Sequence, residues 1–283
     1  MTTKTRYPRK WEWPNGAKIA ISVNLAFEAF INRSQISLQK TPGPDHFSLS
    51  YAEYGVRSGI WRLLDVLDEV GLKGSMSTNG LAAERHPEIV RAVAEAGHEV
   101  VGHGWANDEL VPGDDNPDAE LAQIRKVAGT IASACGVRPV GWVGPGSHGS
   151  KNTLDFLKAE GFIWNGDEAA DDLPYLRDTK HGPIVVMPRV NLPHNDLPMW
   201  YGASNPPGVI FESFKDTFDQ LYREGVAGSP KWTEFTLHAH IGGRPTMSST
   251  IRKCAEYAKS HEGVWFALKR DIAKWAYDRE TRR

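Results

Sequence analysis

Short apolar runs with strand character alternate with amphipathic stretches along nearly the whole chain of 283 residues. Residues 18–27 (KIAISVNLAF) predict a buried strand, and residues 56–70 carry apolar side chains at helical spacing. The same rhythm predicts further strands over 75–79, 98–105, 139–143, 162–165, 183–187, 234–240 and 264–268, and further helices over 87–97, 117–134, 152–160, 211–223, 248–260 and a last stretch ending near residue 278. Such alternation predicts a parallel sheet with helices in its connections. Because no linker interrupts it, one closed (β/α) barrel in a single domain over residues 1–283 is favoured over two domains.

The composition argues against several classes of protein. The chain has 33 Lys and Arg against 35 Asp and Glu, a formal net charge of −2, whereas nucleic-acid and anionic-membrane partners favour a basic face. Its two cysteines, Cys135 and Cys254, are too few and too far apart for a disulfide framework or a thiolate zinc site. No apolar segment follows the basic N-terminus, and no run of about 18 apolar residues occurs. We therefore expect no nucleic-acid partner, no membrane association and a cytoplasmic location.

Two connections are longer than the ~2–6 residues usual after a strand of such a fold. One occupies residues 29–53, directly after the first strand, and the other occupies residues 188–208, which are rich in proline, asparagine and aromatic residues. Long loops commonly cover an active site or form an oligomer contact. We expect both segments to act as lids or as oligomer elements.

Polar side chains gather at the predicted carboxyl ends of the strands. The reactive groups of α/β barrels lie at these ends, because the loops that follow the strands converge there. The residues at these positions are Glu28, Asn79, His103, Asn107, Ser147, His148, Asp167, Asp171, Asp172, His238 and His240. The acids and imidazoles among them predict a reactive site at one rim of the barrel.

Each of these residues also has a purely structural interpretation. A single histidine at a strand end is often a hydrogen-bonded structural residue, and the run at Asp171 and Asp172 can be a capped turn before a proline. Most of the ten tryptophans are expected to pack in the core, and Trp105 and Trp200 are the candidates for pocket walls. Glu28 at a matching rim position favours a functional role for His103 and His238.

Several motifs together resemble the polysaccharide deacetylase (NodB-homology) family. They are WPNGA at 13–17, EYGVR at 53–57, GHEV at 97–100 followed by HGW at 103–105, GW at 141–142, DDLPY at 171–175, LHAHIGGRP at 237–245 and GVWFA at 263–267. The likeness covers nearly the whole chain and is to the branch of metal-independent allantoinases and cyclic-imide hydrolases. It implies the NodB-like fold, a distorted (β/α) barrel of about seven strands, and a hydrolase of carbon–nitrogen bonds other than peptide bonds.

The chain departs from the family's metal-dependent members at the metal ligands. Those members follow the first strand with two acids, a base and then a metal ligand, whereas Glu28 is followed here by Ala29 and Phe30. Those members also have a pair of histidines four residues apart, and this chain has His103 and Asn107 at the two positions. The amide of an asparagine is a poor zinc ligand. We expect no resident cofactor and no metal. The alternative left open is a zinc ion at His103, with Glu28 and His103 as its ligands and His148 or His238 completing the site.

The resemblance implies a role for each of the three catalytic candidates. Glu28 would act as general base on a water molecule, with a pKa raised by burial, and His238 would be the general acid for the leaving nitrogen. His103 would orient Glu28 or polarise the carbonyl group. Backbone N–H groups or the Arg57 guanidinium would stabilise the oxyanion. The full set of expected substrate-binding residues is Arg57, Asn79, Trp105, Asn107, His148, Asp171, Trp200 and His240.

Three functions stay open at this point. A small cyclic amide, imide or ureide suits a site without a metal, because such a substrate is strained or activated and the site lacks a Lewis acid. A metal-dependent deacetylase of N-acetylated saccharides is the second possibility, and a non-catalytic binding protein on the same barrel is the third. The expected partners are a small-molecule substrate and further copies of the chain in a homo-oligomer.

Overall fold

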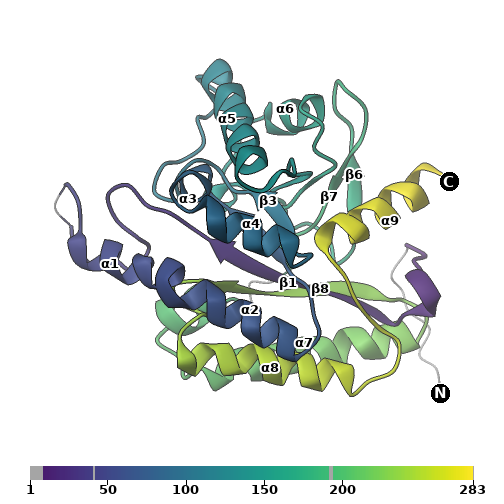
Figure 1. The fold of residues 1–283 in the computed structure, drawn as a ribbon. Coiled ribbons are helices and arrows are strands. Elements are labelled where there is room, and N and C mark those ends of the chain that lie inside the picture. The colour runs from purple at the N-terminus through teal and green to yellow at the C-terminus, as the bar shows by residue number, and fades with distance from the viewer. Residues whose placement is uncertain (1–8, 41, 191–193, 283) are drawn as a thin grey trace.

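The chain folds into a parallel-rich sheet that curls into a distorted barrel with helices on its outside (Figure 1). The structure is a computed structural model that describes residues 9–40, 42–190 and 194–282. The strands of this part are β1 (Ile19–Phe27), β2 (Ser75–Thr78), β3 (Glu99–Gly102), β4 (Gly141–Trp142), β5 (Trp164–Asn165), β6 (Tyr175–Arg177), β7 (Ile184–Val186), β8 (Lys231–His238) and β9 (Val264–Phe266). The predicted α/β fold class and distorted barrel are confirmed.

Helices cover the outer face of the sheet in two groups (Figure 1). They are α1 (His46–Tyr54), α2 (Ile60–Glu69), α3 (Gly80–Arg85), α4 (Pro87–Glu95), α5 (Pro117–Cys135), α6 (Thr153–Ala159), α7 (Gly208–Val226), α8 (Pro245–Lys259) and α9 (Lys269–Thr281). Helices α2, α7 and α8 pack together beside β1 and β8, whereas α3, α4 and α5 pack together beside β3. No helix in the described part of the chain is long and apolar enough to span a bilayer.

The order of the strands leaves a seam in the barrel. The sheet runs β6-β7-β5-β4-β3-β2-β1-β8, β9 also pairs with β1, and β6 is antiparallel to β7. Among the described residues, no ladder joins β8 to β6. Instead, a single parallel bridge pairs Asn195 with Thr236, and the Trp232 N–H donates to the Asp172 carbonyl over 3.2 Å. The expected closure of the barrel is therefore incomplete, and the segment around Asn195 occupies the seam.

Alternation along β1 separates the core from the interior of the barrel. Its odd-numbered side chains, Ile19, Ile21, Val23, Leu25 and Phe27, belong to the main hydrophobic core under the helices. The even-numbered side chains project to the opposite face, since successive side chains of a strand alternate between faces. Glu28 continues the even-numbered series one residue after the strand ends. The same period of two therefore fills the core and directs the acid into the barrel.

The predicted loops contain structure that the sequence did not reveal. Residues 29–53, expected as a loop, include most of α1, and residues 197–202 of the second long connection form a π-helical turn. Strand β6 and helix α3 were not predicted either, because each is too short to show a clear period. Residues 191–193 of the second connection lie outside the described residues.

A π-helical turn, η2 (Gly55–Gly59), brings α2 against the chain that follows β8. A Cβ atom added at Gly59 would lie 1.9 Å from the carbonyl oxygen of Ala239, between His238 and His240. One added at Gly55 would lie 3.0 Å from the backbone nitrogen of His240. The absence of side chains here therefore allows the helix to approach two strand-end histidines.

We predict that Gly59→Ala lowers the free energy of unfolding by about 1–3 kcal/mol, because the new methyl group must displace backbone. Gly129→Ala is the matched control, since Gly129 lies inside α5 with nothing within 4 Å of an added Cβ. The control should stabilise the protein by about 0.4–1 kcal/mol through a smaller entropy of the unfolded chain. Urea titration of both variants measures the difference. Equal stability of the two variants would contradict the close approach at Gly59.

Candidate active site

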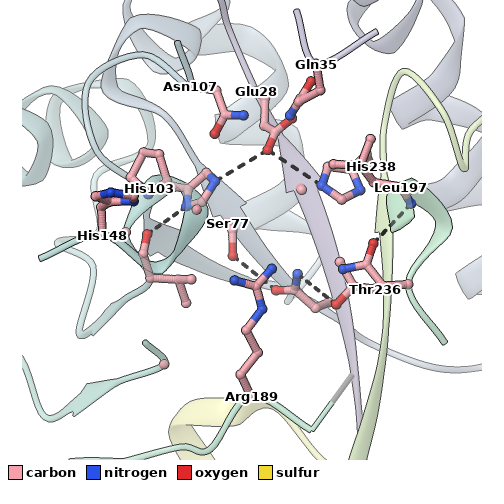
Figure 2. A pocket seen from close by; sticks show the side chains of 18 of the residues that line it. Glu28, Gln35, Ser77, His103, Asn107, His148, Arg189, Leu197, Thr236 and His238 are labelled. Atoms are coloured by element: carbon pink, nitrogen blue, oxygen red, sulfur yellow. Dashed lines mark hydrogen bonds and ion pairs between the residues drawn. The ribbon is translucent and has the colours of Figure 1, made fainter. Parts of the chain in front are cut away.

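Three ionisable side chains from three strands meet at one rim of the barrel (Figure 2). Glu28 follows β1, His103 follows β3 and His238 ends β8. The register places them together: Phe27 pairs with Thr78, Thr78 with Gly102, and Ala26 with His238. The Nε2 atoms of His103 and His238 lie 3.4 and 3.7 Å from the same oxygen, Oε1 of Glu28. The predicted catalytic trio is therefore one cluster, although the role of each member remains a proposal.

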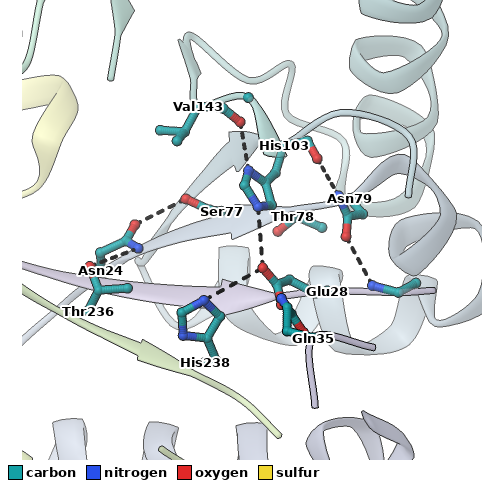
Figure 3. A network of polar contacts seen from close by, with 12 residues as sticks. Asn24, Glu28, Gln35, Ser77, Thr78, Asn79, His103, Val143, Thr236 and His238 are labelled. Carbon is teal, nitrogen blue, oxygen red and sulfur yellow. Dashed lines mark hydrogen bonds and ion pairs between the residues drawn. The ribbon is translucent and has the colours of Figure 1, made fainter. Parts of the chain in front are cut away.

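The Glu28 carboxylate is buried, with 7% of the residue exposed, and is held on both oxygens. Its Oε2 accepts a 2.7 Å hydrogen bond from the side-chain amide of Gln35, and its Oε1 faces the two imidazoles (Figure 3). Gln35 comes from the 29–53 segment and is not among the predicted site residues. That segment therefore contributes directly to the surroundings of the acid.

The expected rise of the Glu28 pKa is wrong. Burial raises the pKa of this carboxyl, but the charge of His238, the hydrogen bond to His103 and the charge of His240 outweigh burial and lower the pKa to about 2. The prediction considered burial alone and omitted the field of the surrounding imidazoles. Glu28 is therefore anionic throughout the neutral range.

His103 has its ring orientation fixed by the backbone. Its Nδ1 lies 2.6 Å from the carbonyl oxygen of Val143, and because a carbonyl only accepts, Nδ1 must carry the proton (Figure 3). The other ring nitrogen, Nε2, then faces Glu28 and can accept or carry a second proton.

His238 is held by a second acid, Asp196, which the sequence did not point to. The fully buried Asp196 accepts hydrogen bonds from Nδ1 of His238 over 2.6 Å and from its backbone N–H over 2.8 Å. Burial lowers the pKa of His238, but the charges of Asp196 and Glu28 outweigh burial and raise it to about 9. His238 is therefore an imidazolium at neutral pH, with its Nε2 proton directed towards Glu28.

The three groups line a cavity of about 300 Å³ that continues into the barrel. Its floor holds an ion pair between Lys269 and Glu234, with a 2.7 Å separation and both side chains about 5% exposed or less. Asn24 and Ser77 lie beside this pair, and the Ser77 hydroxyl donates to the Asn24 side-chain oxygen over 3.0 Å (Figure 3). The volume is at the small end of the ~300–1,000 Å³ typical of ligand sites.

Both long connections contribute to the wall of this cavity. Gln35 belongs to the first, whereas Arg189, Asn195 and Leu197 belong to the second. Arg189 points into the cavity (Figure 2). Asn107 and His148, two of the expected substrate-binding residues, also line it. The prediction that these segments cover a site is consistent with their described residues.

The other expected substrate-binding residues lie elsewhere. Arg57 is exposed on η2. The Asp171 carboxylate forms a 2.8 Å ion pair with the guanidinium of Arg9, near the N-terminus of the chain. Trp105 packs against Gly80 and under the Lys126 ammonium, 3.1 Å from its ring centre. None of these side chains lines the cavity described above. Trp105 and Asp171 follow β3 and β5, but the chain turns away from the rim after each of these strands, and Arg57 lies at no strand end.

Three further expectations are corrected in the same way. Asn79 is fully buried, where its amide accepts from the Ala29 N–H and donates to the His103 carbonyl, so it links two strand ends instead of facing a substrate. His240 is buried beside Phe30, and burial lowers its pKa to about 4. Trp200 is half-buried in the π-helical turn and does not line the cavity.

The donor groups of the rim do not fit a zinc site. Within residues 9–40, 42–190 and 194–282, no three His, Cys, Asp or Glu side chains are arranged to hold a metal ion. The position of the family's second histidine holds the amide of Asn107, which lines the cavity and is a poor zinc ligand. Glu28 and His103 alone do not supply the three or more ligands of a zinc centre.

Comparisons with known proteins agree with this architecture. Residues 39–163 match the sequence profile of a family described as polysaccharide deacetylase. A protein of Schizosaccharomyces pombe named as a polysaccharide deacetylase is 31% identical over 93% of this chain and 91% of its own length. The crystal structure of PuuE allantoinase is 31% identical, covers 95% of this chain and 93% of its own, and has a TM-score of 0.85. A structure described as a probable polysaccharide deacetylase from Pseudomonas aeruginosa is 32% identical, with coverage of 97% and 96% and a TM-score of 0.84.

We predict that Asp196→Asn lowers the pKa of His238 from about 9 towards the ordinary histidine value, because the variant removes the buried negative charge that favours the imidazolium. NMR titration of the imidazole resonances measures the shift. Asp178→Asn, at an exposed position, is the matched control and should leave His238 unchanged. An unaltered His238 pKa in Asp196→Asn would show that Asp196 does not set its charge.

Proposed function

This chain belongs to the polysaccharide deacetylase family of carbon–nitrogen hydrolases, and we propose that its substrate is a small cyclic amide, imide or ureide. The observation that supports this proposal best is the pairing of an anionic acid, Glu28, with a protonated imidazole, His238, 3.7 Å apart in the wall of a small cavity. The one group suits removal of a proton from water, and the other suits protonation of a leaving nitrogen. The similarity to PuuE allantoinase supports the same class of substrate.

In the proposed reaction, a water molecule held at Glu28 and His103 attacks the carbonyl carbon of the substrate. Its proton passes to Glu28, and the new carbon–oxygen bond forms a tetrahedral intermediate. The carbon–nitrogen bond then breaks, and His238 gives its Nε2 proton to the departing nitrogen. The ring opens to a carboxylic acid and a free amine or amide, and the proton on Glu28 restores His238 directly or through water.

The low pKa of Glu28 is compatible with this sequence of proton transfers. The charge of His238 is the leading cause that lowers the Glu28 pKa, whereas burial acts in the opposite direction. When His238 donates its proton, that charge disappears and burial then favours a protonated carboxyl. Glu28 therefore holds the proton that it took from water more firmly once His238 has protonated the leaving nitrogen, until that proton returns to His238.

The shape of the cavity supports a small substrate over a polymer. Gln35 from the first long connection and Leu197 from the second both line a volume of about 300 Å³. A saccharide chain needs a long groove, whereas this small cavity is lined by a buried ion pair between Lys269 and Glu234. The lack of a fitting zinc-ligand set at the rim also favours an activated substrate over an N-acetyl sugar.

The expected homo-oligomer has one supporting feature. Large apolar side chains are exposed on the 29–53 segment and on the start of α1: Ile31 is 44% exposed, Leu38 88% and Phe47 71%. These three residues lie on one segment of the chain, and exposed apolar groups that form a contiguous patch are common at protein–protein contacts. We keep assembly with further copies of the chain as part of the proposal.

We predict that Glu28→Gln lowers kcat/KM on the cyclic substrate by about 10²–10⁴-fold, because an amide cannot take a proton from water. The wild-type protein is first tested on allantoin, dihydrouracil, hydantoin, succinimide and N-acetylglucosamine oligomers, and the best substrate is used for the variants. Glu84→Gln, an exposed change on α3, is the matched control and should retain full activity.

The same assay separates the alternative functions. Activity confined to N-acetylglucosamine oligomers, together with near-stoichiometric zinc by elemental analysis, would favour a metal-dependent deacetylase. Binding without turnover on any compound would favour a non-catalytic protein. Full activity of Glu28→Gln on a cyclic substrate would remove Glu28 from its assigned role.

We also predict an alkaline limb in the pH profile of kcat/KM. His238 must be protonated to act as the acid, and its pKa is raised to about 9, so activity should fall as the pH rises through about 9. In Asp196→Asn the limb should move to lower pH, because the raised pKa is lost. Asp178→Asn should keep the wild-type limb. A limb at the same pH in both variants would be inconsistent with His238 as the acid.

A further inference from the structure

We infer that Arg189 forms a carboxylate-binding site inside the cavity and holds the carboxylate that ring opening creates. This inference rests on the function proposed above and adds a residue that the sequence did not suggest.

Among the described residues the Arg189 guanidinium forms no ion pair, although its charge acts on the buried Asp167 carboxyl and opposes the rise that burial causes in the Asp167 pKa. Nη1 of Arg189 donates to the hydroxyl of Ser147, and among the described residues no carboxylate lies within 4.0 Å of the guanidinium. The other charged groups that line the cavity are already paired: Lys269 with Glu234, and Glu28 with the two histidines. A half-buried guanidinium with most of its five N–H donors unused is therefore the unmatched charge of this pocket.

The guanidinium is held by an unusual local backbone. Ser147 has a φ of +59°, in the left-handed region that side chains other than glycine seldom adopt, and its N–H donates to the Gly144 carbonyl over 2.9 Å. The backbone N–H of Arg189 donates to the Glu168 carbonyl over 2.7 Å. Non-glycine residues in this region occur preferentially at ligand clamps and active sites. Arg189 is thus anchored at its backbone and at one nitrogen of its side chain, with the rest of its planar group directed into the cavity (Figure 2).

The chemistry of the reaction supplies the matching anion. Hydrolysis of a cyclic amide adds the water oxygen to the carbonyl carbon and leaves the nitrogen with a new proton, so the carbon becomes a carboxyl group. At neutral pH that carboxyl loses its proton, because its ordinary pKa lies near 4. The substrate is neutral at this position and the product is an anion. A guanidinium binds a carboxylate through two parallel hydrogen bonds, so it favours the ring-opened form.

The surroundings favour a single carboxylate over a larger anion. Among the described residues that line the cavity of about 300 Å³, Arg189 is the one cation without an ion pair, and the anionic Glu28 lines the same space. A phosphate or dianion would need more positive charge than Arg189 provides. The open product of a small ring carries one carboxylate, which balances one guanidinium.

The test compares ring-opened acids with their isosteric amides by calorimetry. The probes are succinamate against succinamide, and N-carbamoylglycine against its amide. The wild-type protein should bind each acid about 10- to 100-fold more tightly than its amide, as expected for charge-assisted hydrogen bonds. Arg189→Met should abolish this preference while leaving binding of the amides within about threefold. Arg189→Lys should restore part of it, because a lysine supplies the charge without the planar fork.

The control is Arg91→Met, an exposed change on α4 that should keep the full preference. A preference for the acids that persists in Arg189→Met would overturn the inference, as would equal binding of acid and amide, or no measurable binding of any probe, in the wild-type protein. Melting temperatures of all variants show whether each has folded.

The titration needs no turnover, so its result is separate from the proposed function. Turnover of cyclic substrates without a preference for the acids would support the proposed function and contradict the Arg189 site. A preference for the acids without turnover of any cyclic substrate would support the Arg189 site and contradict the proposed function.

Discussion

A buried carboxylate between two imidazoles is the interaction on which the rest of the site depends. Removing a charged acid from water is costly unless opposite charge compensates it, and Glu28 has two histidines within 3.7 Å of one oxygen. His238 in turn requires Asp196 to remain protonated. The charges of Glu28 and His238 therefore depend on each other and on Asp196. The surrounding chain must supply Asp196 to hold His238 and Gln35 to bind the second oxygen of Glu28.

The parts of this site that follow the strand period could be predicted from the sequence. Alternation along β1 and β8 directs Glu28, Thr236 and His238 into the barrel while their neighbours enter the core. Strand-end position therefore predicted that the side chains of Glu28, His103 and His238 lie together at one rim. It misplaced Asp171, because a residue beyond the end of a strand can turn towards solvent or towards another element. It also misjudged the pKa of Glu28, since that value depends on distances across the barrel.

Residues supplied by the long connections could not be predicted. Gln35, Arg189 and Asp196 each reach the site through irregular backbone, where no hydrophobic period indicates direction. The hydrogen bond from Gln35 to Glu28 joins residues seven apart, but those from His238 to Asp196 and from Arg189 to Ser147 each span 42. Only the folded chain brings such partners together.

The seam between β8 and β6 allows one part of the chain to vary without the rest. The stretch around Asn195 fills this edge through one bridge and two bonds from His238, so it contributes little to the ladder that holds the strands together. It nevertheless carries Asp196, the hydrogen-bond partner of His238, and Arg189 lies just before it in the chain. Exchange of this stretch can therefore alter which molecules are accepted while the framework of paired strands stays intact.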